Sequence, residues 1–499
     1  MNVPQTLPDP AALKNTLRSR PQQLFIGGQW LAASAGKTLD VIDPATGDVF
    51  AQAAAGEAAD IDLAVKAARK ALDQGPWRTT PPSERARLLW KLSDAIEANA
   101  AELALLETLD NGMPLWLAQM WNIPKAVDCL RYYSGWPMRL SGETLPVSTP
   151  GEYHTYTRRE PVGVVGQIVA WNMPFGMAVG KIAPALAAGC TVVLKPAEQT
   201  PLSAIRLGQL IQEVGFPEGV VNIVTGTGES AGRPLVDHPD VDKIAFTGST
   251  RVGKSILAAA GANMKRVTLE LGGKSPVFIF PDADLEAASA AAANGIFINT
   301  GQICAAGSRL FIHERIYDQV MAGVVNQARS LQIGPGVEQG TFMGPVVSAL
   351  QRERVNGYVR SAQLQGAEVM SGGQTLPGKG FFVHPTVLSG VRPEMTVMRD
   401  EIFGPVVCAL RFGDEDLDSL ARLANDTSYG LSAYIWTRNV STAHRMAARI
   451  KAGSICVNGG AGMDFTMPFG GFKQSGMGRE HGREGMEAYM ETKTVSITL

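Results

Sequence analysis

Residues 162–195 read VGVVGQIVAWNMPFGMAVGKIAPALAAGCTVVLK, and this stretch sets the pattern for most of the chain. Its apolar residues predict a strand over Val162 to Ala170, a helix over Gly180 to Ala188 and a second strand over Thr191 to Lys195. The alternation of strand, glycine turn and helix continues to about residue 260 and returns from about 273 to 470. Such alternation favours parallel sheets with helices on both faces. We therefore predict an α/β fold with two parallel-sheet domains.

Three segments depart from this pattern. Residues 1 to about 20 are polar and contain prolines, which predicts a loosely ordered arm. Leu140 to Arg159 has strand character and follows helical runs, so we expect a hairpin-like excursion there. The tail from Ala488 to Leu499 alternates polar and apolar residues, and it predicts a strand that joins a sheet edge in this chain or in a neighbouring copy.

Composition excludes several classes of protein. Of 499 residues, 45% are hydrophobic and 18% charged, as in ordinary soluble proteins, and the net charge of -2 offers no basic surface for nucleic acid. Five widely spaced cysteines without a Cys-x-x-Cys motif predict neither a disulfide scaffold nor a metal site. The N-terminus lacks a signal-peptide pattern and no apolar run could span a bilayer, so we expect a cytoplasmic protein with no membrane partner.

One cysteine is distinguished by its position. Cys304 ends the stretch FINTGQIC, which follows an alanine-rich, helix-like run from Asp284 to Asn294. A thiolate is a strong nucleophile that adds to a carbonyl carbon and also leaves readily from the adduct. Considered alone, a free cysteine is more often a small buried hydrophobe.

Two further polar residues follow predicted strands. Glu270 lies in LELGGK, residues 269–274, where partial burial would raise its pKa toward the range of a general base. The alternative is a surface carboxylate on a turn. Asn172 comes directly after a strand, at the end where ligands of α/β sheets bind, and its amide could stabilise an oxyanion. The alternative is that Asn172 serves only the Asn-x-Pro turn.

Glycine-rich turns suggest a phosphate site. The stretch FTGSTRVG, residues 246–253, leaves a strand and opens a helix, so Ser249 and free N–H groups could hold a phosphate. GTGESAG, residues 226–232, has one residue too many for Gly-x-Gly-x-x-Gly, so the standard dinucleotide fingerprint is absent. Three other motifs are individually typical of loops: KPAE at 195–198, EIFGPV at 401–406 and PFGGFKQSGMGRE at 468–480.

In this order, the seven motifs resemble those of the aldehyde dehydrogenase superfamily, in its soluble, NAD(P)-dependent, non-acylating branch. The resemblance runs from about Leu24 to the C-terminus. It implies two Rossmann-like domains, an NAD-binding domain over 1–139 and 160–272 and a catalytic domain over 273–472. It also implies a small β oligomerisation arm formed by 140–159 and 486–499. The assembly it implies is a homotetramer built as a dimer of dimers, with a dimer as the alternative.

The resemblance implies a reaction, the oxidation of a small-molecule aldehyde to its carboxylic acid. Cys304 would attack the aldehyde carbon, while Asn172 and the Cys304 N–H hold the oxyanion. After hydride transfer to a nicotinamide, Glu270 would activate a water that hydrolyses the thioester. Lys181 and Glu480 would relay the proton from Glu270. In this family, Glu491 would pair with arginines at the positions of Arg266 and Arg479.

NAD is expected over NADP, because a carboxylate at Glu198 would accept hydrogen bonds from ribose hydroxyls and repel a 2′-phosphate. The resemblance places Lys195 and Glu198 at the adenosine ribose, Ser249 at the pyrophosphate, and Glu401 with Phe403 at the nicotinamide ribose. The full set of cofactor residues it implies is Ile168, Trp171, Lys195, Glu198, Gly228, Phe246, Gly248, Ser249, Gly272, Glu401 and Phe403.

The substrate entrance contains more glycine than in many relatives, and no Arg or Lys lies in the loop between Asn458 and Pro468. Gly180 occupies a position where relatives that act on small aldehydes often carry a bulky aromatic. We therefore expect a wide apolar tunnel for terpenoid, aromatic or longer aliphatic aldehydes; the alternative is that the glycines only satisfy turns. The expected tunnel residues are Met173, Phe175, Met177, Gly180, Ile303, Ala305, Ala461, Met463 and Phe469.

Two other functions compete with this interpretation. A CoA-acylating relative would pass the acyl group to CoA, but that transfer needs no water-activating base, and Glu270 argues against it. A non-catalytic binding or structural protein with the same fold is the second alternative. The presence of Cys304, Glu270 and Asn172 together argues against that one.

Overall fold

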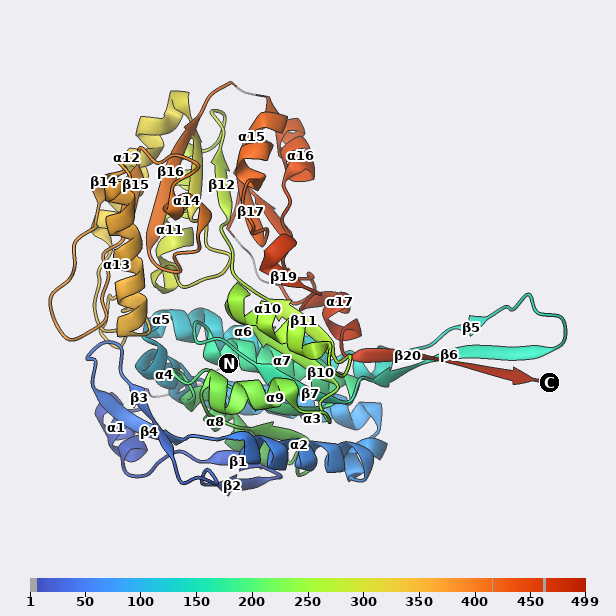
Figure 1. Cartoon of the computed structure of the whole chain (residues 1–499). Coiled ribbons are helices and arrows are strands. Elements are labelled where there is room, and N and C mark those ends of the chain that lie inside the picture. Colours follow the sequence, from blue (N-terminus) through green and yellow to red (C-terminus); the bar gives the residue numbers. More distant parts are fainter. Residues whose placement is uncertain (1–6, 415, 461–463) are drawn as a thin grey trace.

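The structure is a computed structural model that describes residues 7–414, 416–460 and 464–499. Figure 1 shows two α/β lobes, one coloured blue to green and the other yellow to red, with a thin arm that projects to one side. Each lobe is built on one mainly parallel sheet. The prediction of an α/β fold with two parallel-sheet domains is therefore confirmed.

The first lobe contains an eight-stranded sheet in the order β19-β11-β10-β7-β8-β9-β1-β2. The five strands from β11 to β9 run parallel. The chain runs outward from β7 to β9 and then returns to β10 and β11, so a topological switch point lies between β7 and β10, where such sheets bind ligands. The strands are β1 Leu24–Ile26, β2 Gln29–Leu31, β7 Val164–Ile168, β8 Thr191–Lys195, β9 Val221–Ile223, β10 Lys243–Thr247, β11 Arg266–Glu270 and β19 Gly476–Met477.

Helices cover both faces of this sheet (Figure 1). Helix α7 spans Pro174–Ala188 and is largely buried. It begins at Pro174 rather than at the predicted Gly180, because proline is tolerated in the first turn, where its missing N–H would have no helical partner. The other helices of this lobe are α2 Ala58–Asp73, α3 Pro82–Ala98, α4 Ala100–Asn111, α5 Leu115–Leu117, α6 Ile123–Ser134, α8 Leu202–Val214, α9 Arg233–Asp237 and α10 Thr250–Ala260, with a π-helical segment, η2, over Ala118–Asn122.

The second lobe contains a seven-stranded sheet in the order β14-β15-β16-β13-β12-β17-β18, antiparallel only at the β14 edge. Its central strands are almost wholly buried, as expected for parallel strands with helices on both faces. The strands are β12 Pro276–Ile279, β13 Arg309–His313, β14 Glu368–Ser371, β15 Thr386–Ser389, β16 Val406–Phe412, β17 Ser432–Trp436 and β18 Ser454–Val457. The helices are α11 Leu285–Phe297, α12 Tyr317–Ser330, α13 Ala349–Leu364, α14 Thr396–Arg399, α15 Leu417–Asn425 and α16 Val440–Arg449.

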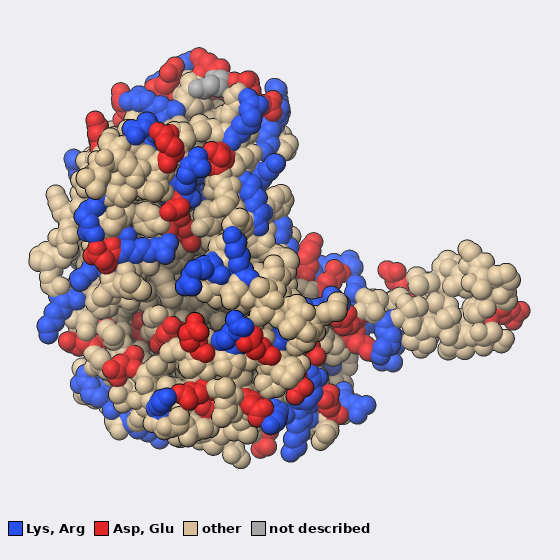
Figure 2. All heavy atoms as spheres, in the orientation of Figure 1, with Lys and Arg blue, Asp and Glu red and all other residues tan. Residues whose placement is uncertain are grey.

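The projecting arm is a three-stranded antiparallel sheet of β5 Thr144–Leu145, β6 Tyr153–Pro161 and β20 Met490–Thr498. This confirms both the hairpin-like excursion and the C-terminal strand. Figure 2 shows few charged side chains toward the tip of the arm. Glu491 of β20 pairs with Arg266 as expected, its Oε2 lying 2.6 Å from Nη2. Arg479 instead donates to two backbone carbonyls, those of residues 471 and 478.

The expectation of a loosely ordered arm over residues 1 to about 20 is wrong for its second half. Helix α1 spans Pro10–Arg18, capped by the Asp9 side chain, and Leu13 and Leu17 pack on an apolar cluster with strands β3 Thr38–Ile42 and β4 Val49–Ala54. An N-cap and two anchoring leucines are enough to order a short helix on a core. Residues 1–6 lie outside the described part of the chain. No helix in the described ranges has the length and apolarity that crossing a bilayer requires.

Candidate active site

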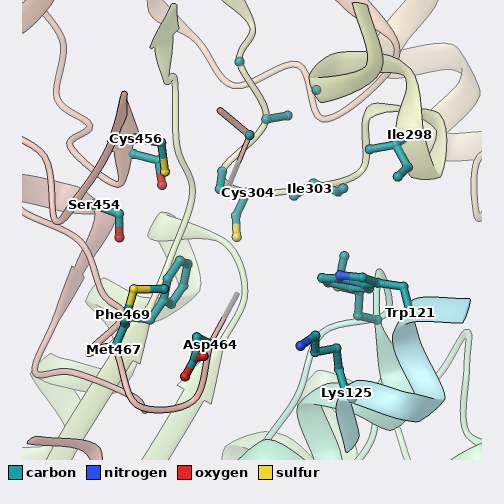
Figure 3. Close-up of a pocket in the computed structure, with 18 of the residues that line it drawn as sticks. Trp121, Lys125, Ile298, Ile303, Cys304, Ser454, Cys456, Asp464, Met467 and Phe469 are labelled. Atoms are coloured by element: carbon teal, nitrogen blue, oxygen red, sulfur yellow. The ribbon is translucent and has the colours of Figure 1, made fainter. Parts of the chain in front are cut away.

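A cavity of about 800 Å³ is lined by residues from both lobes and contains four of the five predicted catalytic side chains. Cys304, Glu270, Asn172 and Glu480 all lie on its wall. Figure 3 shows the Cys304 sulfur pointing into the open space of this cavity. Residues as far apart in the chain as Asn172 and Glu480 are thus brought into one site.

The turn that presents Cys304 has an unusual backbone. Helix α11 ends at Phe297, and Asn299 and Thr300 then adopt left-handed conformations with φ of 49° and 56°. Such values cost free energy for residues other than glycine and persist only where the surroundings enforce them. The end of the turn also packs closely against Gly273, where a Cβ would lie 2.2 Å from the Cys304 carbonyl oxygen. Any residue larger than glycine at position 273 would collide with the Cys304 backbone.

The surroundings of the Cys304 thiol favour its neutral form. Burial raises the pKa of the thiol to about 12, and the carboxylates of Glu401 and Glu270 act in the same direction. Because the thiolate is the nucleophile, the group needs a base close by at neutral pH. A carboxylate in the same cavity supplies one.

Glu270 is that carboxylate. It is only 5% exposed, and its pKa lies well above the usual range because of burial first and the Glu480 carboxylate second, with Lys181 and Arg479 opposing. Within the described residues its Oε2 has no hydrogen-bond partner. A desolvated carboxylate with a raised pKa is a better proton acceptor than one in water.

Lys181 and Glu480 form an ion pair behind Glu270. The Lys181 side chain is buried and does not line the cavity, whereas Glu480 does. The predicted grouping of these two residues with Glu270 is therefore present in space. Sequence reasoning missed the next residue, His481, which lines the cavity with φ of 59° and packs its ring 4.8 Å from that of Phe465.

Asn172 is buried and tied to the cysteine turn. Its side-chain amide donates a 2.8 Å hydrogen bond to the Gln302 carbonyl. An amide nitrogen carries two N–H groups, so one of them remains for a ligand in the cavity. The side chain therefore lies where it could donate to an oxyanion formed beside Cys304.

The predicted adenosine-side residues gather at the carboxyl ends of the first sheet. The strand register sets Ile168 beside Lys195 on one side and beside Phe246 on the other. The buried Lys195 ammonium donates to Glu198 at 2.9 Å, and the Glu198 carboxylate reaches solvent. This is the switch point of the sheet, where a nucleotide is expected.

The neighbouring turn joins strand β10 to helix α10. Ser249 caps helix α10 by accepting from the Val252 N–H, and a Cβ on Gly248 would lie 2.4 Å from the Phe246 ring. A Cβ on Gly228 would meet nothing within 4 Å. The first N–H groups of α10 are the groups at this turn that a phosphate could use.

The predicted nicotinamide-side residues come from the second lobe. Glu401 is partly buried, and the loss of solvation raises the pKa of its carboxyl, which accepts a 2.8 Å hydrogen bond from the Gly273 N–H. A Cβ on Gly272 would lie 2.4 Å from Glu401 Oε2. Phe403 has φ of 59° and packs edge-on against Trp171, with ring centroids 5.1 Å apart. The chemistry and spacing of these residues fit a dinucleotide.

Most of the predicted tunnel residues line the cavity. Phe175 does not: it is fully buried in the core of the first lobe, because helix α7 turns it away from the face that presents residues 173 and 177. Ala461 and Met463 lie outside the described residues. The six that line the cavity are Met173, Met177, Gly180, Ile303, Ala305 and Phe469.

Other lining residues were not among the predicted tunnel residues. Trp121 and Lys125 lie on or next to α6, and Asp464 and Met467 precede the 468–480 motif. Figure 3 shows these two pairs on opposite sides of the space below Cys304. Asp464 and Met467 lie in the loop between Asn458 and Pro468 that we expected at the substrate entrance, whereas nothing in the sequence places Trp121 and Lys125 at the site.

The comparisons with known proteins agree with this geometry. A sequence model of the Aldehyde dehydrogenase family matches residues 30–495, and the chain belongs to this family. The fold and the site are accordingly those of an aldehyde oxidoreductase.

Individual relatives match along almost the whole chain. An aldehyde dehydrogenase of Enchytraeus buchholzi is 45% identical and covers 100% of this chain and 99% of its own. A phenylacetaldehyde dehydrogenase of Pseudomonas fluorescens is 46% identical and covers 96% of each chain. A solved structure of the NAD+ complex of aldehyde dehydrogenase from Bacillus cereus, 46% identical, superposes with a TM-score of 0.95 over 97% of this chain and 98% of that one.

Proposed function

We propose that this protein oxidises a bulky apolar aldehyde to the carboxylic acid, with NAD as cofactor, through a thioester on Cys304. The observation that carries the proposal is the presence of Cys304, Glu270 and Asn172 on the wall of one largely apolar cavity. Nucleophile, base and oxyanion donor are the three groups that this chemistry needs.

The first half of the reaction forms a bond to sulfur. Glu270 takes the proton of the Cys304 thiol, and the thiolate adds to the aldehyde carbon. The carbonyl oxygen then carries negative charge, which the Asn172 amide and the Cys304 N–H stabilise. NAD, when bound, supplies the acceptor for the hydride that leaves this carbon. The carbonyl group re-forms as a thioester on Cys304.

The second half releases the acid. Glu270 accepts a proton from a water that attacks the thioester carbon, and the carbon–sulfur bond breaks to free Cys304. The ion pair of Lys181 and Glu480 lies next to Glu270 and supports the proposal that these side chains pass its proton onward. A water-activating base is unnecessary for acyl transfer to CoA, so Glu270 favours hydrolysis.

The choice of NAD over NADP depends on Glu198. Its carboxylate reaches solvent beside the buried Lys195, where it would bind ribose hydroxyls and repel a 2′-phosphate. The relative from Bacillus cereus was solved with NAD+ bound, which supports the choice of NAD.

We also propose the division of the chain into domains. Residues 1–139 and 160–272 would form the cofactor domain, and residues 273–472 the catalytic domain.

The substrate class follows from the walls of the cavity. Gly180 borders open space, because a Cβ there would meet nothing within 4 Å. A volume of about 800 Å³ exceeds what a two-carbon aldehyde fills. The lining side chains near Cys304, such as Ile303, Met177 and Phe469, are apolar. An aromatic, terpenoid or longer aliphatic aldehyde would bury its surface there.

The arm supports a proposed assembly. Strands β6 and β20 project from the body with little of the chain around them (Figure 1), and strand edges exposed in this way commonly pair with another chain. We propose a homotetramer, a dimer of dimers in which residues 140–159 and 486–499 form the contacts, working in the cytoplasm. Mass measurement in solution separates tetramer, dimer and monomer.

The direct test of the function is a panel of aldehydes assayed with NAD and with NADP. We expect NADH absorbance at 340 nm with decanal, geranial and phenylacetaldehyde, a weaker response with acetaldehyde, and a free acid as the product by mass spectrometry. Formation of acyl-CoA only when CoA is present would favour the acylating alternative. No reduced cofactor with any aldehyde would refute the proposal.

A further inference from the structure

The outer part of the cavity has a charged pair that the proposed reaction does not use. Lys125, on α6, and Asp464, before the 468–480 motif, both line the cavity. In Figure 3 the Cys304 sulfur points between Trp121 on one side and Phe469 on the other; Lys125 lies beyond Trp121 and Asp464 beyond Phe469. A molecule bound at Cys304 therefore passes two rings before it reaches two opposite charges.

The Asp464 carboxylate is held in place by hydrogen bonds to one of its two oxygens. Its Oδ1 accepts from the Thr466 N–H at 2.8 Å and from the Thr466 hydroxyl at 2.6 Å. The pKa of the Asp464 carboxyl is lowered mainly by these bonds, and in smaller part by the charge of Lys125. Its charged form is thus favoured, and within the described part of the chain no residue donates a hydrogen bond to its Oδ2.

Lys125 makes only one long ion pair within the described residues. Among the described residues its ammonium contacts Asp128, three residues on in the same helix, at 3.4 Å, and a partly exposed pair of this kind contributes little. Lys125 and Asp464 influence each other electrostatically, yet no direct ion pair joins these two described residues. A donor and an acceptor therefore face a shared gap.

We propose, on the basis of the function proposed above, that the substrate is an aromatic aldehyde with a hydroxyl group on the ring end away from the aldehyde. The ring lies between Trp121 and Phe469, the hydroxyl donates to Asp464, and it accepts from Lys125. A hydroxyl satisfies both groups because it is a donor and an acceptor at once.

Other substituents fit this pair less well. A methyl group of the same size removes water from both charges and returns no hydrogen bond. A carboxylate gains Lys125 but is repelled by Asp464 and by Asp128. Hydrogen bonds to charged groups are stronger than those between neutral ones, so the hydroxyl has a measurable advantage.

The experiment compares para-hydroxy, para-methyl and para-carboxy forms of benzaldehyde, phenylacetaldehyde and 3-phenylpropanal, with NAD. The readout is the ratio of kcat/KM for the hydroxy and methyl forms, since this ratio cancels any general loss of activity. We expect the hydroxy form to be favoured about tenfold over the methyl form in at least one of the three series. The carboxy form should be the poorest.

Three variants assign the effect to the residues. Lys125→Met and Asp464→Asn should each bring the hydroxy-to-methyl ratio close to one, and Asp464→Asn should improve the carboxy form relative to the methyl form. The amide oxygen introduced by Asp464→Asn can still accept from Thr466, so the local turn is kept. Lys66→Met, which removes an exposed ammonium from α2 outside the cavity, is the matched control and should keep the wild-type ratio.

The outcomes are distinguishable. If no member of the series yields NADH, the proposed function fails and this inference fails with it. Oxidation of the methyl forms without a hydroxyl advantage in any series overturns the inference alone. So does a wild-type preference for the carboxy form, or a hydroxyl advantage that persists in both Lys125→Met and Asp464→Asn.

Discussion

Asn299 donates its side-chain amide to the backbone carbonyl of Asn172 at 2.9 Å. Because Asn172 in turn donates to the Gln302 carbonyl, the turn before Cys304 and the turn after β7 are bonded in both directions. Two residues that are 127 positions apart in the chain therefore fix the turn before Cys304, the proposed nucleophile, relative to Asn172, the proposed oxyanion donor. The first prediction tests this relation.

Replacing Asn172 by Ala should lower kcat by about 10²–10³-fold, which is typical for loss of one oxyanion donor. KM for the aldehyde should change much less, because the hydrogen bond strengthens only as charge develops on oxygen. Steady-state kinetics with decanal measures both. Asn122→Ala, at another cavity amide, is a matched control for the loss of a buried polar group. Equal losses in the two variants would contradict an oxyanion role.

The rate of thioester hydrolysis should rise with pH through a pKa above the ordinary carboxyl range. Glu270 acts as a base only when ionised, and burial together with Glu480 raises its pKa, so acidification removes the active form. Single-turnover deacylation measured from pH 5 to 9 gives the profile. Glu270→Gln should slow deacylation by two or more orders of magnitude and flatten the profile, roughly as for other general bases. An unchanged profile in that variant would exclude Glu270 as the base.

Replacing Glu198 by Gln should raise kcat/KM for NADP relative to NAD. The change removes the negative charge that would repel a 2′-phosphate and keeps the size of the side chain. We expect the NADP-to-NAD ratio to increase by about tenfold, equivalent to ~1.4 kcal/mol. Glu229→Gln, an exposed carboxylate in the neighbouring turn, serves as control. If the NADP-to-NAD ratio of kcat/KM changed equally in both variants, Glu198 would not be the residue that selects NAD.

Gly180→Trp should narrow the cavity next to Met177. The position borders open space, so an indole can enter without displacing backbone. Activity with decanal or geranial should fall by at least about tenfold, while activity with acetaldehyde is kept or improved, since overfilled pockets exclude large ligands first. The measurement is kcat/KM across aldehydes from two to ten carbons. A uniform loss at every length would argue against a wide tunnel.

The alternation of apolar segments was sufficient to predict the two sheets, and the motifs were sufficient to identify the candidate reacting residues. The strands around Val164–Ile168 and Thr191–Lys195 are short, apolar and separated by helices, so their parallel pairing was predictable. The position of Cys304 relative to Glu270 followed from a resemblance and not from spacing, because contacts between lobes have no local signature. The start of α7 was misjudged since glycines at 176 and 180 weaken the helical pattern.

The remaining parts of the site depend on side-chain direction. Phe175 and Met177 lie two residues apart on the same helix, yet one is in the core and the other on the cavity wall. Lys125 and Asp464 come from segments with no motif and meet only in the folded chain. The second thiol of the cavity, Cys456, has no surrounding motif that sets it apart from the other cysteines in the sequence.

That second thiol makes one measurement especially informative. Glu270→Gln removes the base for both steps, so the thioester should form slowly and be hydrolysed more slowly still, and prolonged reaction with NAD and decanal should leave an acyl group on the protein. Digestion and mass spectrometry locate the group, with Cys304→Ala in the same background as control. We expect the peptide that contains Cys304 to gain the mass of a decanoyl group, and we expect no such gain in the control. An acyl group on the Cys456 peptide, or normal turnover in Cys304→Ala alone, would contradict it.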